Sequence, residues 1–95
     1  MAVAVERVHT ATGAVTAARG FAAAAVHAGI RRSKLDLAVV RSTVPAVGTG
    51  MFTANRVQAA PVLVSKEHLS QSGGVARAIV ANSGCANACT GDDGV

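Results

Sequence analysis

The sequence has almost no aromatic residues: it contains two phenylalanines and neither tryptophan nor tyrosine. Its apolar half consists mainly of small side chains, with 21 alanines and 15 valines. Small side chains bury little area each, and burial stabilises a fold by only about 25 cal/mol per Å² of apolar surface. A chain of 95 residues is also short for building a core of its own. We therefore expect the chain to need partner surface, as one piece of a larger fold.

Cysteine is also scarce, and the only two, Cys85 and Cys89, lie four positions apart. A disulfide across so short a loop is geometrically demanding, and a zinc site needs further ligands close in sequence. The histidines His9, His27 and His68 are dispersed and match no such pattern. We therefore predict free thiols, no metal site and a reducing compartment, the cytoplasm.

Acidic residues are outnumbered by basic ones, five to nine, so that the net charge is +4. The basic residues are mostly scattered, and only Arg31, Arg32 and Lys34 cluster. Nucleic-acid-binding surfaces typically combine a basic patch with aromatic side chains that stack on bases. Because aromatics are missing, we interpret the cluster as a solvated turn and expect no nucleic-acid partner. The longest apolar run, residues 21–26, is far below the roughly 18 residues of a membrane span, so we expect no membrane partner.

Patterns of common catalytic chemistry are missing as well. The dinucleotide pattern GxGxxG and the phosphate-loop pattern GxxxxGK are both absent. No Ser-His-Asp or Cys-His arrangement follows from the spacing, and nothing near Cys89 in the sequence supplies a base. The adjacent carboxylates Asp92 and Asp93 are typical of a solvated loop. The residues by themselves therefore predict no catalytic mechanism.

The most informative stretch is residues 77–91, which read RAIVANSGCANACTG. Its apolar run, residues 78–81, includes two β-branched side chains and is typical of a buried strand. In the small-residue loop that follows, Asn82 and Asn87 offer donors and acceptors to nearby backbone. Such a junction between a strand and a loop is a common place for a functional site. A tight, self-bonded turn is the more common explanation of such residues, since loops usually serve turns before sites.

The rest of the chain predicts short strands with short links, and one helix. Strands are expected over residues 35–40, 47–53, 60–64 and 75–81, with a turn at 43–46 because proline cannot donate to a ladder. The expected helix spans residues 66–72, with Ser65 as its N-cap, Glu67 in its first turn and Gly73-Gly74 at its end. Residues 20–30 fit a helix or a strand, and residues 1–10 a strand or a disordered lead-in. Since short links favour antiparallel neighbours, we predict an α+β (mixed α/β) fold of mostly antiparallel strands with a short helix.

Four ordered stretches resemble the N-terminal part of the ornithine acetyltransferase family, the bifunctional glutamate N-acetyltransferases. They are residues 20–30 (GFAAAAVHAGI, similar to GFxAAGVxAGIK), residues 36–40 (DLAVV), residues 51–62 (MFTANRVQAAPV, similar to VFTxNxVxAAPV) and residues 77–91 (similar to RAIVVNSGNANACTG). The resemblance covers about residues 15–95. Three residues depart from the family pattern: Ala25 replaces a glycine, Arg31 a lysine, and Cys85 an asparagine or glycine. A thiol cannot supply the paired donor and acceptor of a carboxamide.

The resemblance implies an acyltransferase of arginine biosynthesis that moves an acetyl group from N2-acetyl-L-ornithine to L-glutamate. Some members also use acetyl-CoA as a substrate, and no cofactor is implied. The family precursor cleaves itself before a threonine into α and β chains that stay together, and that threonine forms the acetyl-enzyme.

The resemblance also implies that residues 1–95 are a single incomplete domain, the N-terminal segment of the α chain. They would form the N-terminal piece of the family's layered sandwich fold. Expected partners are the rest of the α chain, the β chain in a hetero-oligomer, and small-molecule substrates.

The family's nucleophile, oxyanion donors and substrate-binding residues all lie beyond residue 95. We therefore assign no catalytic and no substrate-binding residue here, and Thr90 is not the nucleophile. We predict instead a loop that supports the site from behind, formed by Asn82, Ser83, Gly84, Asn87, Thr90 and Gly91. Two other hypotheses stay open: a truncated or diverged relative without activity, and a small basic binding module.

Overall fold

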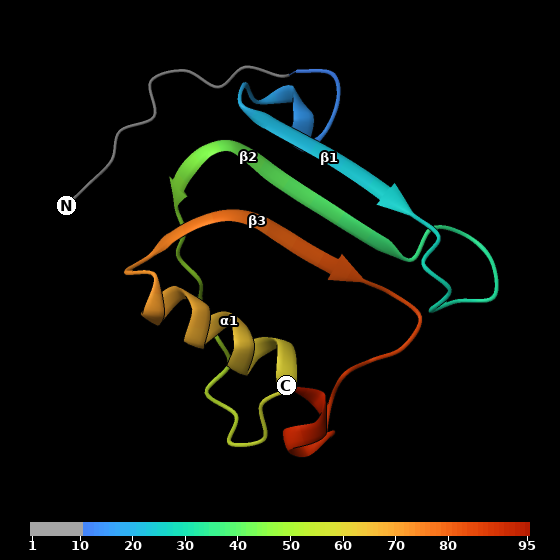
Figure 1. Ribbon diagram of the computed structural model, residues 1–95, viewed down its shortest axis with the longest axis vertical. Coiled ribbons are helices and arrows are strands. Elements are labelled where there is room, and N and C mark those ends of the chain that lie inside the picture. Colours follow the sequence, from blue (N-terminus) through green and yellow to red (C-terminus); the bar gives the residue numbers. More distant parts are fainter. Residues whose placement is uncertain (1–10) are drawn as a thin grey trace.

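The computed structural model describes residues 11–95, which form a three-stranded antiparallel sheet, one α-helix and two short 3-10 helices (Figure 1). The strands are β1 (Phe21–Val26), β2 (Leu37–Val47) and β3 (Val75–Asn82), and they lie in the order β1-β2-β3. The helices are η1 (Val15–Ala17), α1 (Ala60–Gln71) and η2 (Gly91–Gly94). The predicted class of mostly antiparallel strands with one helix is confirmed. The prediction for residues 1–10 lies outside the described residues.

The alanine run of β1 is a strand, although alanine alone favours helix. Every residue of β1 pairs with β2, from Phe21 opposite Ser42 to Val26 opposite Leu37. Pairing with β2 therefore overrides the intrinsic preference of the alanines, as tertiary context commonly does. The structure thus decides the open alternative in favour of a strand over Phe21–Val26, while residues 27–30 lie in the loop that follows.

Strand β2 is longer than predicted, because it continues through the segment expected to be a turn. Residues 43–46 belong to β2, and the register against β3 shifts between Arg41 and Ala46. Such an irregularity accommodates Pro45, which has no N–H to donate to the ladder. The turn prediction was therefore wrong.

The strand predicted over residues 47–53 was also wrong, since β2 ends at Val47 and no strand follows it there. The close backbone approach expected at its glycines is present at Gly48. The Gly48 N–H donates to the Gly74 carbonyl at 2.7 Å, and a Cβ on Gly48 would lie 3.1 Å from side-chain atoms of Leu69 and Ala76. Gly48 thus lets the chain cross the junction between α1 and β3.

Helix α1 begins six residues earlier than predicted, at Ala60. The strand predicted over residues 60–64 and the N-cap role of Ser65 were both wrong, because these residues form the first turns of the helix. Pro61 stands at its start, where a missing N–H costs nothing since that donor has no partner inside the helix. The predicted C-terminal signal is confirmed: Gly73 and Gly74 have φ of +65° and +84°.

Little apolar surface is buried. Among residues 11–95 the only buried apolar side chain is Ala60. Ile79 and Val80 are neighbours in β3 and point to opposite faces of the sheet, yet they are 70% and 65% exposed. The radius of gyration is 16.2 Å, compared with about 12 Å for a compact domain of this length. Both faces of the sheet are thus open at β3.

Helix α1 lies beside β3 rather than across the sheet (Figure 1). A cleft of about 460 Å³ separates its C-terminal turns from the start of β3, with Leu69, Val75 and Ala76 in its lining. Because α1 lies beside the sheet, it leaves the apolar strands without a second layer.

Within residues 11–95 no helix is both long and apolar enough to cross a membrane.

This exposure predicts the behaviour of the polypeptide 1–95 on its own. We expect it to unfold without a cooperative thermal transition and to bind a hydrophobic dye, because it lacks a buried core to melt. Circular dichroism during heating, with the molecular mass followed by sedimentation, measures this. A sharp transition in a monomeric species would contradict the expectation.

Candidate functional site

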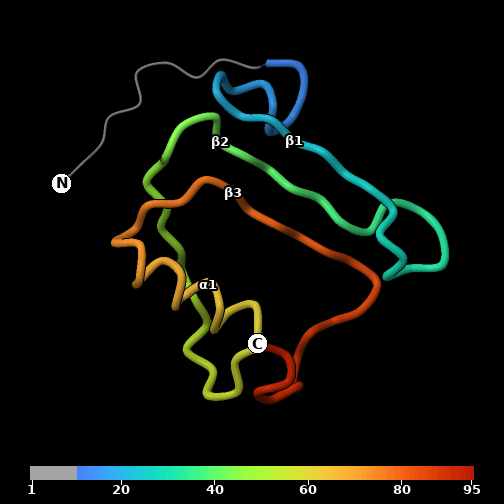
Figure 2. Tube along the Cα trace, in the orientation of Figure 1, coloured from blue at the N-terminus to red at the C-terminus, as the bar shows by residue number. Residues whose placement is uncertain are grey.

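The predicted supporting loop lies at one end of the sheet, next to a second loop. These are the 82–91 loop, which follows β3, and the 27–36 loop, which joins β1 to β2. Leu37 at the start of β2 pairs with Val26 at the end of β1 and with Asn82 at the end of β3. Both loops therefore leave the sheet from the same end, as the chain trace shows (Figure 2).

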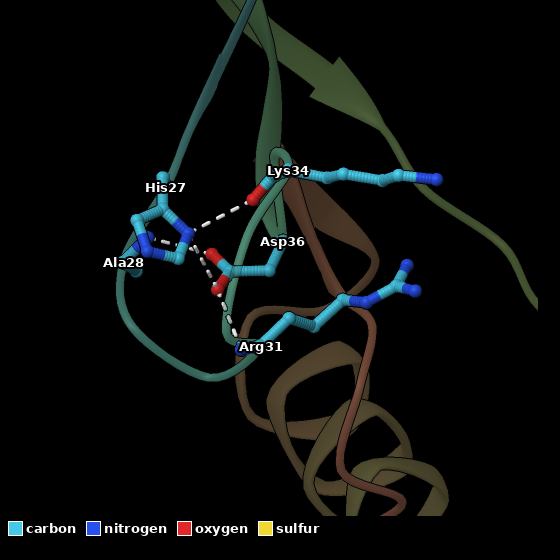
Figure 3. A network of polar contacts seen from close by, with 5 residues as sticks. All are labelled: His27, Ala28, Arg31, Lys34 and Asp36. Atoms are coloured by element: carbon cyan, nitrogen blue, oxygen red, sulfur yellow. Dashed lines mark hydrogen bonds and ion pairs between the residues drawn. The ribbon is translucent and has the colours of Figure 1, made fainter.

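Asp36 organises the 27–36 loop with a buried carboxylate (Figure 3). One carboxylate oxygen accepts the backbone N–H of Ala28 at 2.6 Å, and the other accepts that of Arg31 at 2.9 Å. The Asp36 side chain is 0% exposed, and His27 Nδ1 lies 3.4 Å from its Oδ2. The backbone N–H of Arg31, followed by that of Ala28, lowers the pKa of Asp36 below its ordinary value. The carboxylate is therefore ionised at neutral pH.

The other contacts of the 27–36 loop close it tightly. His27 Nδ1 also lies 2.9 Å from the Lys34 carbonyl oxygen, and the Asp36 N–H donates to the Val26 carbonyl at 3.0 Å. Gly29 has a φ of +90° and Lys34 a φ of +75°, so the loop turns through the left-handed region twice. The loop shape thus depends on backbone bonds to Asp36 and His27.

Two contacts join the 82–91 loop to the 27–36 loop. The Ser83 N–H donates to the Asp36 carbonyl at 2.9 Å. A Cβ on Gly84 would run into Cγ of Arg31 and would lie 3.0 Å from its Cδ, and Gly84 has a φ of +99°. Only glycine can place the backbone this close to the Arg31 stem in that conformation. Ser83 and Gly84 therefore form the junction of the two loops.

The remaining predicted residues bond within their own loop or to η2, which follows it directly. Asn87 Nδ2 donates to the Gly94 carbonyl at 2.7 Å, and the Thr90 hydroxyl donates to Asn87 Oδ1 at 2.6 Å. Asn82 Nδ2 donates to the Cys85 carbonyl at 3.2 Å, and Gly91 begins η2 with a φ of +60°. The loop is thus a self-bonded turn whose far end is held by Asn87. Cys85 takes part only through its carbonyl, which any residue supplies.

The two thiols are free and exposed, as their spacing predicts. Cys89 has a φ of +56°, a conformation that favours glycine or asparagine. No group of three or more metal-ligating side chains lies together in the described part of the chain. Asp92 and Asp93 are exposed in η2. The two loops bring no nucleophile together with a base. Their hydrogen bonds hold the backbone in place.

Asp36 is the residue that sequence reasoning missed. The sequence pattern marks it only as the first residue of a strand motif, whereas the structure buries it between the two loops. The available signal was a single carboxylate between Leu35 and Leu37, directly before an apolar strand. Buried acidic residues are rare unless their oxygens are bonded, so such a position predicts backbone partners.

The Asn87 bonds predict the effect of removing its side chain. In the intact protein, Asn87→Ala should lower the free energy of unfolding by about 1–2 kcal/mol, because the Gly94 carbonyl and the Thr90 hydroxyl both lose a partner. Asn55→Ala is the matched control, since Asn55 is exposed and accepts only the nearby Val57 N–H. Chemical denaturation measures both variants. Equal losses in the two would remove the case for Asn87 as a special support.

The lowered pKa of Asp36 predicts how stability depends on pH. Because the folded-state pKa lies below the unfolded-state value of about 3.9, the stabilisation is complete above pH 4 and is lost as the pH falls through the folded-state pKa. Asp36→Asn should therefore flatten the acid limb of the stability profile. Denaturation midpoints of the intact protein between pH 2 and pH 6 measure this, with the exposed carboxylate variant Glu67→Gln as control. An acid limb that Asp36→Asn leaves as steep as in the wild type would contradict it.

Comparison with known proteins matches most of the chain. The ArgJ family model matches residues 22–95. The arginine biosynthesis bifunctional protein ArgJ of Shouchella clausii is 46% identical over 83 residues, which are 87% of this chain and 20% of that protein. The protein of the same name from Nitratidesulfovibrio vulgaris is 55% identical over 78 residues, 81% of this chain and 20% of that protein. The chain thus spans about a fifth of the length of these relatives.

Two solved structures share the fold as well as the sequence. The ArgJ crystal structure from Bacillus halodurans matches with a TM-score of 0.79 and 44% identity, over 86% of this chain and 42% of that one. The ornithine acetyltransferase from Mycobacterium tuberculosis, complexed with ornithine, matches with a TM-score of 0.73 and 50% identity. This match covers 84% of this chain and 42% of that one. These matches confirm the resemblance noted in the sequence. With its glycine-bearing loop after β3, its three antiparallel strands and this shared sequence, the chain belongs to the ArgJ family.

Proposed function

We propose that this chain is the N-terminal segment of the α chain of an ornithine acetyltransferase. The whole enzyme transfers an acetyl group from N2-acetyl-L-ornithine to L-glutamate in arginine biosynthesis. The observation that carries this proposal is the match of residues 22–95 to the ArgJ family. Because the chain spans only 20% of its curated relatives, the activity belongs to a longer protein of which residues 1–95 are a single incomplete domain.

In this proposal the chemistry is performed by residues beyond the chain. The family's threonine attacks the acetyl carbonyl, ornithine leaves, and the acetyl-enzyme then reacts with the amine of glutamate, so that the kinetics are ping-pong. Residues 11–95 contribute the sheet and the 82–91 loop. In this proposal the 82–91 loop supports the active site from behind. The observation that favours this role is that the 82–91 loop and the 27–36 loop lie at the same end of the sheet.

Partner chains follow from the open sheet. Ile79 and Val80 expose apolar surface on opposite faces of β3, and in a stable protein such surface is covered. We propose that the rest of the α chain and the β chain cover it in a hetero-oligomer. The matched segment makes up 42% of the solved Bacillus halodurans chain but 20% of the curated relatives. Solved chains about half as long as the curated proteins support a precursor divided in two.

The remaining features of the proposal concern substrates and location. No cofactor takes part in the proposed reaction. The relatives are named bifunctional, and if this enzyme is bifunctional too, acetyl-CoA is its additional acetyl donor. The Mycobacterium tuberculosis enzyme was solved in complex with ornithine, and ornithine is the leaving group of the proposed reaction. We place the enzyme in the cytoplasm, where free thiols such as Cys85 and Cys89 persist.

The proposal predicts an activity of the protein purified from its native gene. With N2-acetyl-L-ornithine and L-glutamate, double-reciprocal plots should give parallel lines, and acetylglutamate and ornithine should form in equal amounts. The same assay with acetyl-CoA decides whether it is a donor. The control is the polypeptide 1–95, which should show no transfer.

Absence of transfer with both donors would favour the truncated or diverged relative. Salt-sensitive binding of nucleic acid without transfer would favour the small basic module.

A further inference from the structure

We propose that Asp36 is a positioning residue for the 82–91 loop. Its carboxylate fixes the 27–36 loop, and the fixed loop in turn provides the two contacts on which Ser83 and Gly84 rest. The catalytic consequence of this inference rests on the proposed acetyl transfer. The structural part rests only on contacts among residues 26–84.

The carboxylate of Asp36 needs two accepting oxygens. Each oxygen takes a different backbone N–H, from Ala28 and from Arg31, at 2.6 Å and 2.9 Å. An asparagine would offer one oxygen and would turn an NH₂ donor toward the second N–H. Because the side chain is buried, water cannot replace the lost acceptor at low cost. The shape of the 27–36 loop therefore depends on the acid rather than on a side chain of that size.

The backbone of Asp36 connects the same residue to both neighbouring segments. Its N–H donates to the Val26 carbonyl at 3.0 Å, and its carbonyl accepts the Ser83 N–H at 2.9 Å. Asp36 thus links the end of β1, the 27–36 loop and the 82–91 loop. A change in its side-chain bonds therefore acts on the residue whose carbonyl holds Ser83.

Arg31 provides the second contact between the loops. Its N–H is held by Asp36, and its side chain extends away from that carboxylate (Figure 3). The methylene carbons of this side chain, Cβ, Cγ and Cδ, are the atoms that a Cβ on Gly84 would meet. The surface on which Gly84 lies is therefore a stretch of alkyl chain whose backbone Asp36 fixes. The guanidinium is not needed for this contact.

The test compares five variants in the intact protein by hydrogen exchange and mass spectrometry. In Asp36→Asn and Arg31→Ala, the amide hydrogens of peptides covering residues 82–91 should exchange about tenfold faster than in the wild type, because the loop loses support. Arg31→Lys should keep the wild-type rate, since lysine retains Cβ, Cγ and Cδ. Arg32→Ala and Glu67→Gln are matched controls at exposed positions and should also keep it.

Activity supplies the second readout. The kcat for acetyl transfer, measured well below the melting temperature of each variant, should fall about tenfold in Asp36→Asn and Arg31→Ala, through displacement of the supported site. Arg31→Lys should keep the wild-type kcat, because lysine retains the alkyl chain. If the guanidinium were the group that matters, Arg31→Lys would lose kcat as Arg31→Ala does. If Asp36→Asn does not fold, the comparison of Arg31→Ala with Arg31→Lys decides.

Unchanged exchange at residues 82–91 in both variants would overturn the inference, as would equal loosening in Arg31→Lys or in Arg32→Ala. If the wild type transfers no acetyl group, the proposed function fails, and the exchange rates still decide the positioning role.

Discussion

The backbone pairing of β2 with both of its neighbours is the interaction on which the described structure depends. β2 is the central strand, so its two ladders hold β1 and β3 in the sheet. Side-chain packing adds little, because Ala60 is the only buried apolar side chain among residues 11–95. Hydrogen bonds by themselves contribute modestly to net stability, since the unfolded chain makes similar bonds to water. A sheet held in this way has little buried apolar surface to stabilise it, which is the physical reason for the proposal that it is part of a larger protein.

The polar contacts at the loop end of the sheet follow the same logic. β1, β2 and β3 bring the 27–36 and 82–91 loops together, and backbone bonds to Asp36 then fix how they touch. The two loops use little apolar contact beyond the Arg31 stem against Gly84. An ionised carboxylate that accepts two N–H groups defines a conformation more sharply than contacts among alanines would. A chain with few large side chains therefore specifies the loop end of its sheet through polar geometry.

The strand β3 and the loop after it could be predicted from the sequence, because an apolar β-branched run and a glycine-rich boundary both point to one structure. The end of α1 at Gly73-Gly74 was predictable for the same reason. Its start was not, since Pro61 followed by Val62 and Val64 has the composition of a strand, and proline in the first helical turn is equally compatible. The β1 alanines were left open and the segment around Pro45 was misjudged, because pairing between strands decides both. The alanines pair with β2, and Pro45 lies in β2 at the register shift against β3. Neither pairing is local in sequence. Of the loop residues, Asn87 was singled out from the sequence, while the proposed role of Asp36 depends on three segments that meet only in the fold.

The intact mass of the native gene product tests most directly whether residues 1–95 are the front of a working acetyltransferase. The sample is purified without protease and analysed by denaturing gel and mass spectrometry, with the N-terminal residue of each chain determined. The account predicts two chains, both larger than 9.4 kDa, one of which begins with threonine. A single species near 9.4 kDa would contradict it, because the catalytic part would then be absent and the family resemblance would describe ancestry rather than activity.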